Sequence, residues 1–351
     1  MILDQLAVPI VLAPLGGGPS TPELAAAVTN AGGLGFLAAG YLTADVLQDR
    51  IRETRTLTNG PLGVNVFVPG PPAAAAADAV AAYAASLAVD ASLAGITLGE
   101  ARSHDDDWDA KLSLLGADPL PVTSFTFGCP DPSVIAPLKA AGSEVWVTVT
   151  DPAEADEAAA DGADVLVVQG SEAGGHRSSF RDDPADDPGG YGLLSLLQLV
   201  RARTSLPLVA AGGISTGAGV AAVLAAGASA AQLGTAFLRC PEAGTPAVHR
   251  AAVASADTTG MTRAFTGRLA RGIRNQFMAD HDYHAPSAYP EVHYLTAPLR
   301  AAGRSAGNPE LVNLWAGQTH ELSRELPAAD LVAVLATEAR EALQAAGARL
   351  R

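Results

Sequence analysis

The sequence predicts an α/β protein built as a (β/α)8 barrel, in which parallel strands alternate with helices. Two features indicate this fold. Short aliphatic runs alternate with longer helix-forming stretches as far as Leu233, and the runs are continuously apolar, as strands buried on both faces are. Because alternating strands and helices give parallel sheets with right-handed crossovers, eight such units favour a closed barrel over an open sheet.

Each aliphatic run is taken as one strand, and together they fill the length of a typical barrel of about 250 residues. Several are followed by a helix start, such as Asp151 with Pro152 at the first helical position. The Ala-rich stretch from Ala73 is expected to be the helix after the third run. The runs are Val8–Ala13, Gly35–Ala39, Leu62–Val68, Val122–Phe127, Glu144–Val149, Val165–Val168, Leu208–Ala211 and Ala230–Leu233.

The rhythm of strands and helices divides the chain into three parts. Residues 1–238 are predicted to form the barrel. Residues 239–317 are rich in Arg, His, Tyr and Pro and have no clean strand runs, so they are predicted to be a mostly helical lid inserted after the eighth strand. Residues 318–351 contain an amphipathic stretch, Asp330–Ala346, expected to return to the barrel as a helix.

Residues Ala91–Asp118 interrupt the alternation between the third and fourth runs. They contain the acidic run that follows His104, and a run of like charges is usually a solvated surface. We therefore expect a surface excursion there rather than a metal site.

Composition excludes several functions. The formal net charge of −15 would repel a nucleic-acid backbone, so no nucleic-acid partner is expected. The most apolar stretch, Ala73–Leu98, is broken by Asp78 and Asp90, which argues against a membrane span. The N-terminus lacks the pattern of a signal peptide, and Cys129 and Cys240 make no disulfide framework, so a cytoplasmic protein is expected.

Polar and glycine-rich segments follow the aliphatic runs, at the strand ends where barrel enzymes place their active sites. The glycines after the seventh and eighth runs favour a phosphate site, because they let backbone amides approach an anion. The alternative is a pair of tight turns. The segments are Pro14–Pro22, Gln169–Arg177, Gly212–Thr216 and Gly234–Thr235, and Asn65 interrupts the third run itself.

Amide side chains occur within or beside the expected strands, at Asn65, Gln169 and Gln232. A buried amide needs hydrogen-bond partners. A flat heterocycle with alternating donors and acceptors, such as a flavin ring, would supply them, and so would an internal network with the main chain.

His176 is the strongest catalytic candidate, because an imidazole in a glycine-flanked loop at the active-site end can exchange a proton near neutral pH. Arg177 beside it would attract an anionic substrate. A solvent-exposed loop histidine is the alternative. His281, His284 and His293 lack a matching fourth ligand, so no metal is expected, and that segment is predicted to line the substrate pocket.

These segments together resemble the nitronate monooxygenases, formerly called 2-nitropropane dioxygenases. The resemblance spans nearly the whole chain, and the segment from Gln169 to Arg177 is its most specific motif. Two positions depart from the family pattern: Leu15 stands where many members have Met, and Ser178 where Gly is usual. The matching segments are Ala13-Pro14, Ser20–Pro22, Asn30–Gly35, Gly63–Asn65, Phe127–Pro130, Gln169–Arg177, Ala211–Ile214, Gln232–Thr235, Thr262–Arg268, Arg271–Asn275 and Trp315–Gln318.

The last of these segments points to the class I enzymes of the family. The resemblance implies non-covalently bound FMN and oxidation of alkyl nitronates by O₂, which gives an aldehyde or ketone and nitrite, with propionate 3-nitronate as the typical substrate. It places His176 at the catalytic position, and it suggests Arg177, Tyr289 and Tyr294 as substrate-pocket candidates. The FMN contacts it implies are Ala13, Asn65, Gln169, Gly174, Gly212, Gly213, Gln232, Leu233, Gly234 and Thr235.

Two alternatives stay open at this point. A related barrel reductase that uses NAD(P)H, either a quinone reductase or an enoyl-acyl-carrier-protein reductase, shares the motif around His176. A flavin- or phosphate-binding scaffold without activity is the other alternative. The expected partners are a small nitronate or nitroalkane and O₂, and the expected assembly is a monomer or homodimer.

Overall fold

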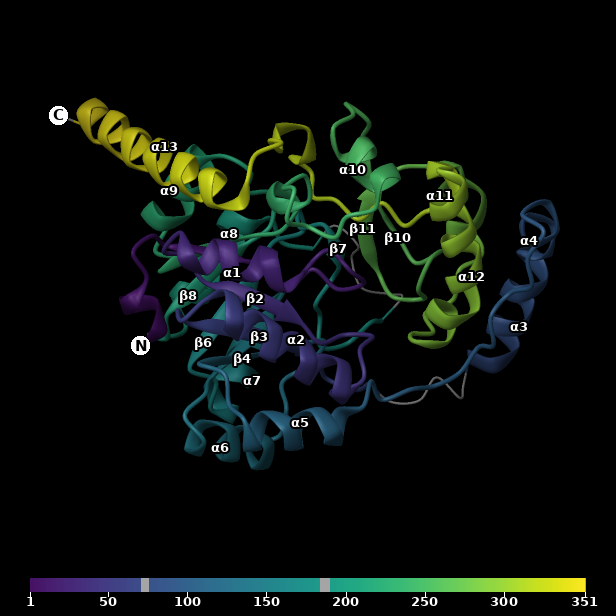
Figure 1. Ribbon diagram of the computed structural model, residues 1–351, viewed down its shortest axis with the longest axis horizontal. Coiled ribbons are helices and arrows are strands. Elements are labelled where there is room, and N and C mark those ends of the chain that lie inside the picture. The colour runs from purple at the N-terminus through teal and green to yellow at the C-terminus, as the bar shows by residue number, and fades with distance from the viewer. Residues whose placement is uncertain (71–75, 184–189, 351) are drawn as a thin grey trace.

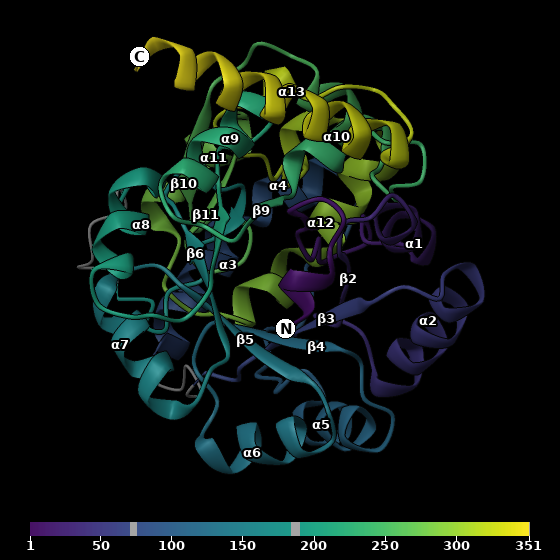
Figure 2. The same ribbon diagram turned by 90° about the vertical axis from the view of Figure 1, so that its left-hand side faces the viewer.

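The protein is a closed barrel of parallel strands with a lid at one end (Figures 1 and 2). The computed structural model describes residues 1–70, 76–183 and 190–350. Within them, eight parallel strands pair in the order β1-β9-β8-β6-β5-β4-β3-β2. The barrel closes where Val11 and Leu34 form a parallel bridge between the first two strands. The prediction of a (β/α)8 barrel is therefore confirmed.

The strands agree closely with the aliphatic runs, and the helices lie around them. The barrel strands are β1 (Ile10–Leu12), β2 (Gly35–Ala38), β3 (Leu62–Phe67), β4 (Val122–Thr126), β5 (Glu144–Val149), β6 (Val165–Gln169), β8 (Leu208–Ala211) and β9 (Ala230–Leu233). The helices of the barrel segment are α1 (Pro22–Asn30), α2 (Ala44–Leu57), α3 (Ala77–Ser86), α4 (Ala88–Leu93), α5 (Trp108–Ala117), α6 (Pro132–Ala140), α7 (Pro152–Asp161), α8 (Leu193–Arg201) and α9 (Gly217–Ala225).

Continuous apolar runs are required because each strand faces two cores. In β6, Val165 and Val167 pack inside the barrel, whereas Leu166 and Val168 pack against the surrounding helices. Successive side chains of a strand point to opposite faces, so both faces must be apolar. Helix starts follow the capping rules: the Asp151 carboxylate, for example, accepts hydrogen bonds from the first turn of α7.

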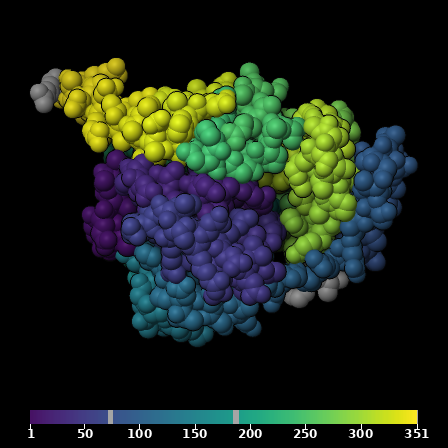
Figure 3. Space-filling model, viewed as in Figure 1, coloured from purple at the N-terminus to yellow at the C-terminus, as the bar shows by residue number. Residues whose placement is uncertain are grey.

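The Ala-rich helix after β3 is not a barrel helix, which corrects the sequence prediction. Helices α3 and α4 leave the barrel and pack against the lid (Figure 3). Val80 and Tyr83 there share a core with Leu295 and Leu299. Helix α5 takes the position beside the barrel instead, packing against α2 and α6. Alanine periodicity predicts a helix but not its partner. Residues 73–75 of the stretch lie outside the described residues.

The acidic run after His104 is not wholly solvated, which corrects a second expectation. The Asp106 carboxylate lies 2.7 Å from the ammonium of Lys111, whose side chain is fully buried. The same carboxylate accepts a hydrogen bond from the main-chain N–H of Tyr41 at 2.9 Å. This ion pair therefore attaches the surface excursion to the loop after β2.

The lid contains strands that the sequence did not reveal. Strands β10 (Thr259–Thr262) and β11 (Ala270–Ile273) form an antiparallel pair, and β11 also pairs with β7 (Gly175–His176) from the barrel segment. Strands this short show no hydrophobic alternation. The remaining helices are α10 (Ala247–Val253), α11 (Gln276–His281), α12 (Glu291–Ala306) and α13 (Ala328–Arg349), with 3-10 turns at Ile2–Gln5, Thr235–Phe237, Asp282–His284, Pro309–Leu311 and His320–Leu322.

The C-terminal helix α13 packs along α9 and α1 of the barrel segment. A Cβ on Gly217 at the start of α9 would overlap Glu338 and Ala339 of α13. Gly217 thus allows close packing of α9 against α13. Among the described residues, no helix combines the length and apolar character needed to cross a bilayer.

Candidate active site

A cavity of about 410 Å³ lies where the C-terminal ends of the strands meet the lid. Loops after most of the barrel strands contribute to it, and lid residues cover it. Its lining includes Pro14, Gly16, Tyr41, Asn65, Phe127, Gln169, Gly174, His176, Gly212, Gly213, Gln232, Gly234, Thr235, His249, Thr266, His293, Arg300, Arg304 and Trp315. The cavity therefore brings together segments that are far apart in the sequence.

His176 is held in this cavity by a strand rather than by a flexible loop. In strand β7 it lies opposite Ala270 of β11, and the next residue, Arg177, donates its N–H to the Leu269 carbonyl at 2.8 Å. The imidazole is surrounded by aromatic rings: its centroid lies 5.6 Å from that of Phe127 and 5.6 Å from that of Trp315. The lid thus fixes both the main chain and the ring of the candidate base.

The environment of His176 strongly favours the neutral imidazole. Its pKa is lowered from 6.5 to about 3, mainly by burial under the lid and in smaller part by the charges of Arg268 and Arg300. A neutral imidazole keeps one basic nitrogen, so it can accept a proton at physiological pH.

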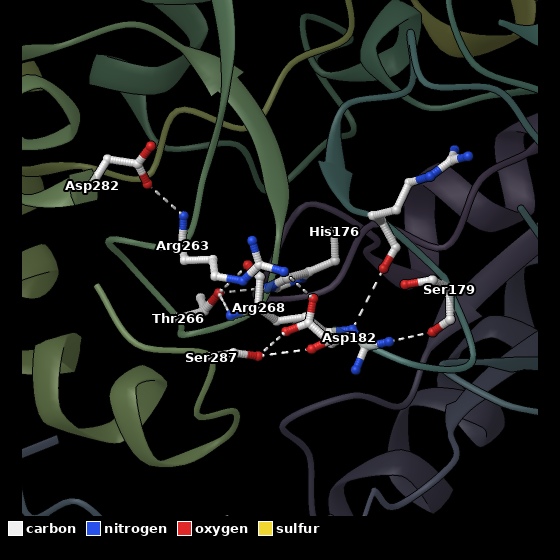
Figure 4. A network of polar contacts seen from close by, with 9 residues as sticks. His176, Ser179, Asp182, Arg263, Thr266, Arg268, Asp282 and Ser287 are labelled. Atoms are coloured by element: carbon white, nitrogen blue, oxygen red, sulfur yellow. Dashed lines mark hydrogen bonds and ion pairs between the residues drawn. The ribbon is translucent and has the colours of Figure 1, made fainter. Parts of the chain in front are cut away.

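A polar network joins the loop after β7 to the lid (Figure 4). Asp182 pairs with Arg263 at 2.8 Å and accepts a hydrogen bond from the Ser287 hydroxyl at 2.8 Å. The Arg268 guanidinium, which donates to the Ser179 carbonyl, lies 4.0 Å from the centroid of the Phe127 ring. These contacts hold the lid over His176.

Asn65 and Gln169 differ in whether their side-chain amides are free to contact a ligand or are engaged in an internal hydrogen-bond network. Asn65 donates to the hydroxyls of Ser124 and Thr126, at 2.9 and 3.0 Å, which leaves its oxygen as the group it can offer to a ligand. Gln169 instead donates to the His176 carbonyl and exchanges hydrogen bonds with Ser178. The amide of Gln169 is therefore engaged in the internal network and positions His176, although Gln169 also lines the cavity.

The loops after β8 and β9 form a cradle in which added side chains would interfere. Gly212 and Gly213 have φ values of +114° and +65°, and a Cβ on Gly213 would meet the Glu172 Cβ at 2.9 Å. A Cβ on Gly234, directly after β9, would come within 3.1 Å of the Leu15 side chain. Backbone-lined glycine turns beside amide side chains fit a phosphate-bearing flavin such as FMN.

Four residues that the sequence interpretation suggested as ligand contacts do not line the cavity, namely Arg177, Leu233, Tyr289 and Tyr294. Arg177 points away from the cavity and donates to the carbonyls of Gln169 and Thr150. Tyr294 does not line the cavity, and the Arg102 guanidinium lies over its ring at 4.5 Å. Leu233 is fully buried in the barrel core.

Tyr289, His281 and His293 of the lid have separate roles. Tyr289 lies directly beside His176, with 5.7 Å between ring centroids, and its hydroxyl donates to that of Tyr41 at 3.2 Å. His281 pairs with Asp90 of α4, whereas His293 stacks on the ring of Tyr41. His281 and His293 therefore serve different contacts.

One face of α12 lines the cavity with His293, from the segment expected to line a substrate pocket, and with three residues that the sequence interpretation missed. These are Ala297, Arg300 and Arg304, which follow His293 at the spacing of successive turns of a helix. This spacing was the available signal, because two arginines on one face of a lid helix indicate an anion site. The Tyr41 side chain carried no comparable signal in the sequence.

The charge of the cavity is opposite to that of the whole chain. Among the described residues, Arg300 and Arg304 line it and no Asp or Glu does. Arg300 is buried, and its guanidinium donates hydrogen bonds to the Thr296 hydroxyl and to His293. No carboxylate of the described residues lies within 4 Å of it. A buried, unneutralised guanidinium is costly unless an anion binds there.

A barrel with a lidded, positively charged cavity and a buried histidine at its strand ends has the arrangement of a barrel enzyme's active site. Residues 2–338 match the family model described as nitronate monooxygenase. The chain is 41% identical to a nitronate monooxygenase of Paraburkholderia phytofirmans over 96% of this chain and 93% of that protein. It is 42% identical to one of Pseudomonas aeruginosa, covering 95% and 96%.

Solved structures agree with these relatives. A nitroalkane oxidase from Streptomyces ansochromogenes superposes with a TM-score of 0.95 at 52% identity, covering 98% of this chain and 99% of that one. FabK from Thermotoga maritima superposes with a TM-score of 0.77 at 26% identity, covering 99% and 97%. The chain belongs to the nitronate monooxygenase family, and it is an oxidoreductase.

Proposed function

We propose that the protein uses FMN to oxidise alkyl nitronates with O₂, giving an aldehyde or ketone and nitrite. The observation that carries this proposal is the convergence of glycine turns, the Asn65 amide, His176 and two arginines on one cavity. Family membership supports the same reaction type.

The residues of the cavity suit FMN in two ways. The glycine turns after β8 and β9, at Gly212, Gly213 and Gly234, and the hydroxyl of Thr235 would hold its phosphate. The amides of Asn65 and Gln232 would face its ring system. When bound, FMN supplies the redox chemistry, and the protein supplies orientation and charge.

The arginines of α12 favour a substrate that carries a negative charge. A nitronate is an anion, and propionate 3-nitronate carries a carboxylate as well. Arg300 and Arg304 lie on successive turns of α12 on the same cavity wall, so they can bind two anionic groups or one group jointly. The closed lid strengthens this attraction because it excludes water.

His176 is assigned the role of base when a neutral nitroalkane enters. Its ring lines the cavity and is neutral, so it can remove the acidic α-proton. The similarity to a nitroalkane oxidase supports this second substrate class. The variant His176→Asn is expected to lose turnover of nitroethane by ~100-fold or more, while retaining bound flavin. Wild-type rates in this variant would remove the assigned role.

The competing function is that of an NAD(P)H-dependent reductase on the same barrel. Anaerobic mixing separates the two. The flavin absorbance of the purified protein is expected to bleach on addition of propionate 3-nitronate and to stay unchanged with NADH. Bleaching by NADH alone would favour the reductase, and a protein that binds no FMN would contradict both. The cytoplasmic location and the monomeric or homodimeric state stay predictions. Size-exclusion chromatography tests the oligomeric state.

A further inference from the structure

The hydroxyl of Thr266 lies 2.9 Å from Nε2 of His176, across 90 residues of sequence. Thr266 is in the turn between β10 and β11, and it is fully buried. Figure 4 shows the two side chains directed toward each other. The proposed function uses His176 as a base, but it leaves open which of the two ring nitrogens accepts the proton.

The partners of the hydroxyl decide where its single proton lies. The Thr266 hydroxyl is 3.2 Å from the Arg268 carbonyl oxygen, which can only accept, and 3.4 Å from the Arg268 N–H, which can only donate. If the hydroxyl donates to the carbonyl, its oxygen accepts from both the Arg268 N–H and the Nε2–H of His176. All of these donors and acceptors are then satisfied.

The opposite arrangement satisfies fewer groups. If Thr266 donated its proton to Nε2, the carbonyl of Arg268 would lose this donor, and the ring would carry its proton on Nδ1. Within the described part of the chain, Nδ1 of His176 has no recorded hydrogen-bond partner. The first arrangement gives every polar atom of this turn a partner and leaves Nδ1 of His176, which lines the cavity, as a basic nitrogen, so it is favoured.

We propose that Thr266 is a positioning residue that keeps the proton of neutral His176 on Nε2 and so makes Nδ1 the proton acceptor. When a nitroalkane reacts, its α-C–H bond breaks and an N–H bond forms at Nδ1. The bonding electron pair stays on the substrate, which becomes the nitronate. The imidazolium then donates through Nε2–H to Thr266.

The turn that carries Thr266 is held independently of this hydrogen bond. Gly267 has a φ of +77°, and a Cβ there would overlap the Ala288 main chain. Strand pairing of β11 with β10 and β7 fixes the residues that follow. Thr266→Val therefore removes the hydroxyl with little change of shape, and Thr266→Ser restores it. Thr245→Val is a matched control, because the buried Thr245 hydroxyl has no hydrogen-bond partner among the described residues.

The first test reads the tautomer without using activity. In the FMN-loaded protein with ¹⁵N-labelled histidine, two-bond ¹H–¹⁵N correlations identify the protonated ring nitrogen, and His176→Asn assigns the signal. We expect Nε2–H in the wild type, in Thr266→Ser and in Thr245→Val, and a shift toward Nδ1–H or a tautomer mixture in Thr266→Val. An Nδ1–H signal in the wild type, or an unchanged tautomer in Thr266→Val, would overturn the proposal.

The second test rests on the proposed function and compares two substrates. Thr266→Val is expected to lose ~10 to 100-fold in kcat for nitroethane, with a larger loss than for ethylnitronate, which needs no proton removal. Thr266→Ser should recover most of that ratio. Equal losses for both substrates in Thr266→Val would contradict the positioning role. Lack of turnover by the wild type would instead refute the proposed function and leave the tautomer result standing.

Discussion

The ring of Tyr41 lies parallel to the imidazole of His293, with 4.2 Å between centroids and 3° between planes. Tyr41 follows a barrel strand, and His293 is on lid helix α12. The φ of Tyr41 is +67°, an uncommon value for a residue with a side chain. The Tyr41 N–H donates a hydrogen bond to the Asp106 carboxylate, which pairs with the buried Lys111 ammonium. The hydrogen bond to Asp106 thus helps to hold Tyr41 in this strained conformation, in which the Tyr41 ring contacts the lid.

Replacing Tyr41 should therefore weaken lid closure. Tyr41→Leu loses the stacked pair, worth about 0.5–1.5 kcal/mol, so we expect KM for nitronates to rise several-fold and the lid to become more sensitive to protease. Tyr41→Phe keeps the stack and should change KM less. Exposed Tyr283 supplies the control, Tyr283→Leu. A Tyr41→Leu protein with wild-type KM and protease resistance would show that the contact does not hold the lid.

Acid should destabilise the protein through its buried histidines. Burial lowers the pKa of His176 to about 3, of His249 to about 4 and of His293 to about 2. The unfolded chain binds these protons near pH 6.5, so below that pH it holds more protons than the native state. The free energy of unfolding is therefore expected to fall as the pH drops from 6.5 toward 4.

Denaturant titrations at several pH values measure this slope. His249 lies 2.9 Å from the Trp315 carbonyl, and glutamine can replace its hydrogen-bond donor there. His249→Gln removes one titrating group, so its stability should depend less steeply on pH than that of the wild type. An equal slope in both proteins would show that His249 takes up its proton without unfolding.

Arg300 should select for substrates with a second negative charge. Removing its charge in Arg300→Met is expected to lower kcat/KM for propionate 3-nitronate ~10 to 100-fold more than for ethylnitronate, because a hydrogen bond to a charged group is worth about 1.5–3 kcal/mol. Arg300→Lys should retain part of the preference. Arg52→Met, at an exposed ion pair on α2, is the control. Equal losses for both nitronates would assign Arg300 to the nitronate group or to folding alone.

Gly213 should be essential for flavin binding. Its φ is +65°, and a Cβ there would come within 2.9 Å of the Glu172 Cβ, so Gly213→Ala must shift the turn beneath the expected phosphate. We expect at least ~10-fold weaker FMN binding, since a shift of the amides weakens each of their charge-assisted hydrogen bonds. Fluorescence titration with FMN measures it. Gly116→Ala, where a Cβ meets nothing within 4 Å, should bind FMN normally.

The barrel could be predicted because its signals are local. Strands such as β6 are apolar throughout since both faces are buried, and the glycine turns at Gly212 and Gly234 follow their strands directly. The sequence predicts His176 and Asn65 at the active-site end for the same reason, because position in a strand–helix unit decides which end of the barrel a residue occupies.

What only the tertiary structure decided is the direction and partner of each side chain. His176 faces the cavity and Arg177 does not, because successive residues at strand β7 point to opposite sides and pairing with β11 fixes which side is which. The chain by itself determined the barrel, its active-site end and the candidate base. Folding determined the partners Thr266, Tyr41 and Arg300, because contacts across tens of residues depend on packing that no local pattern encodes.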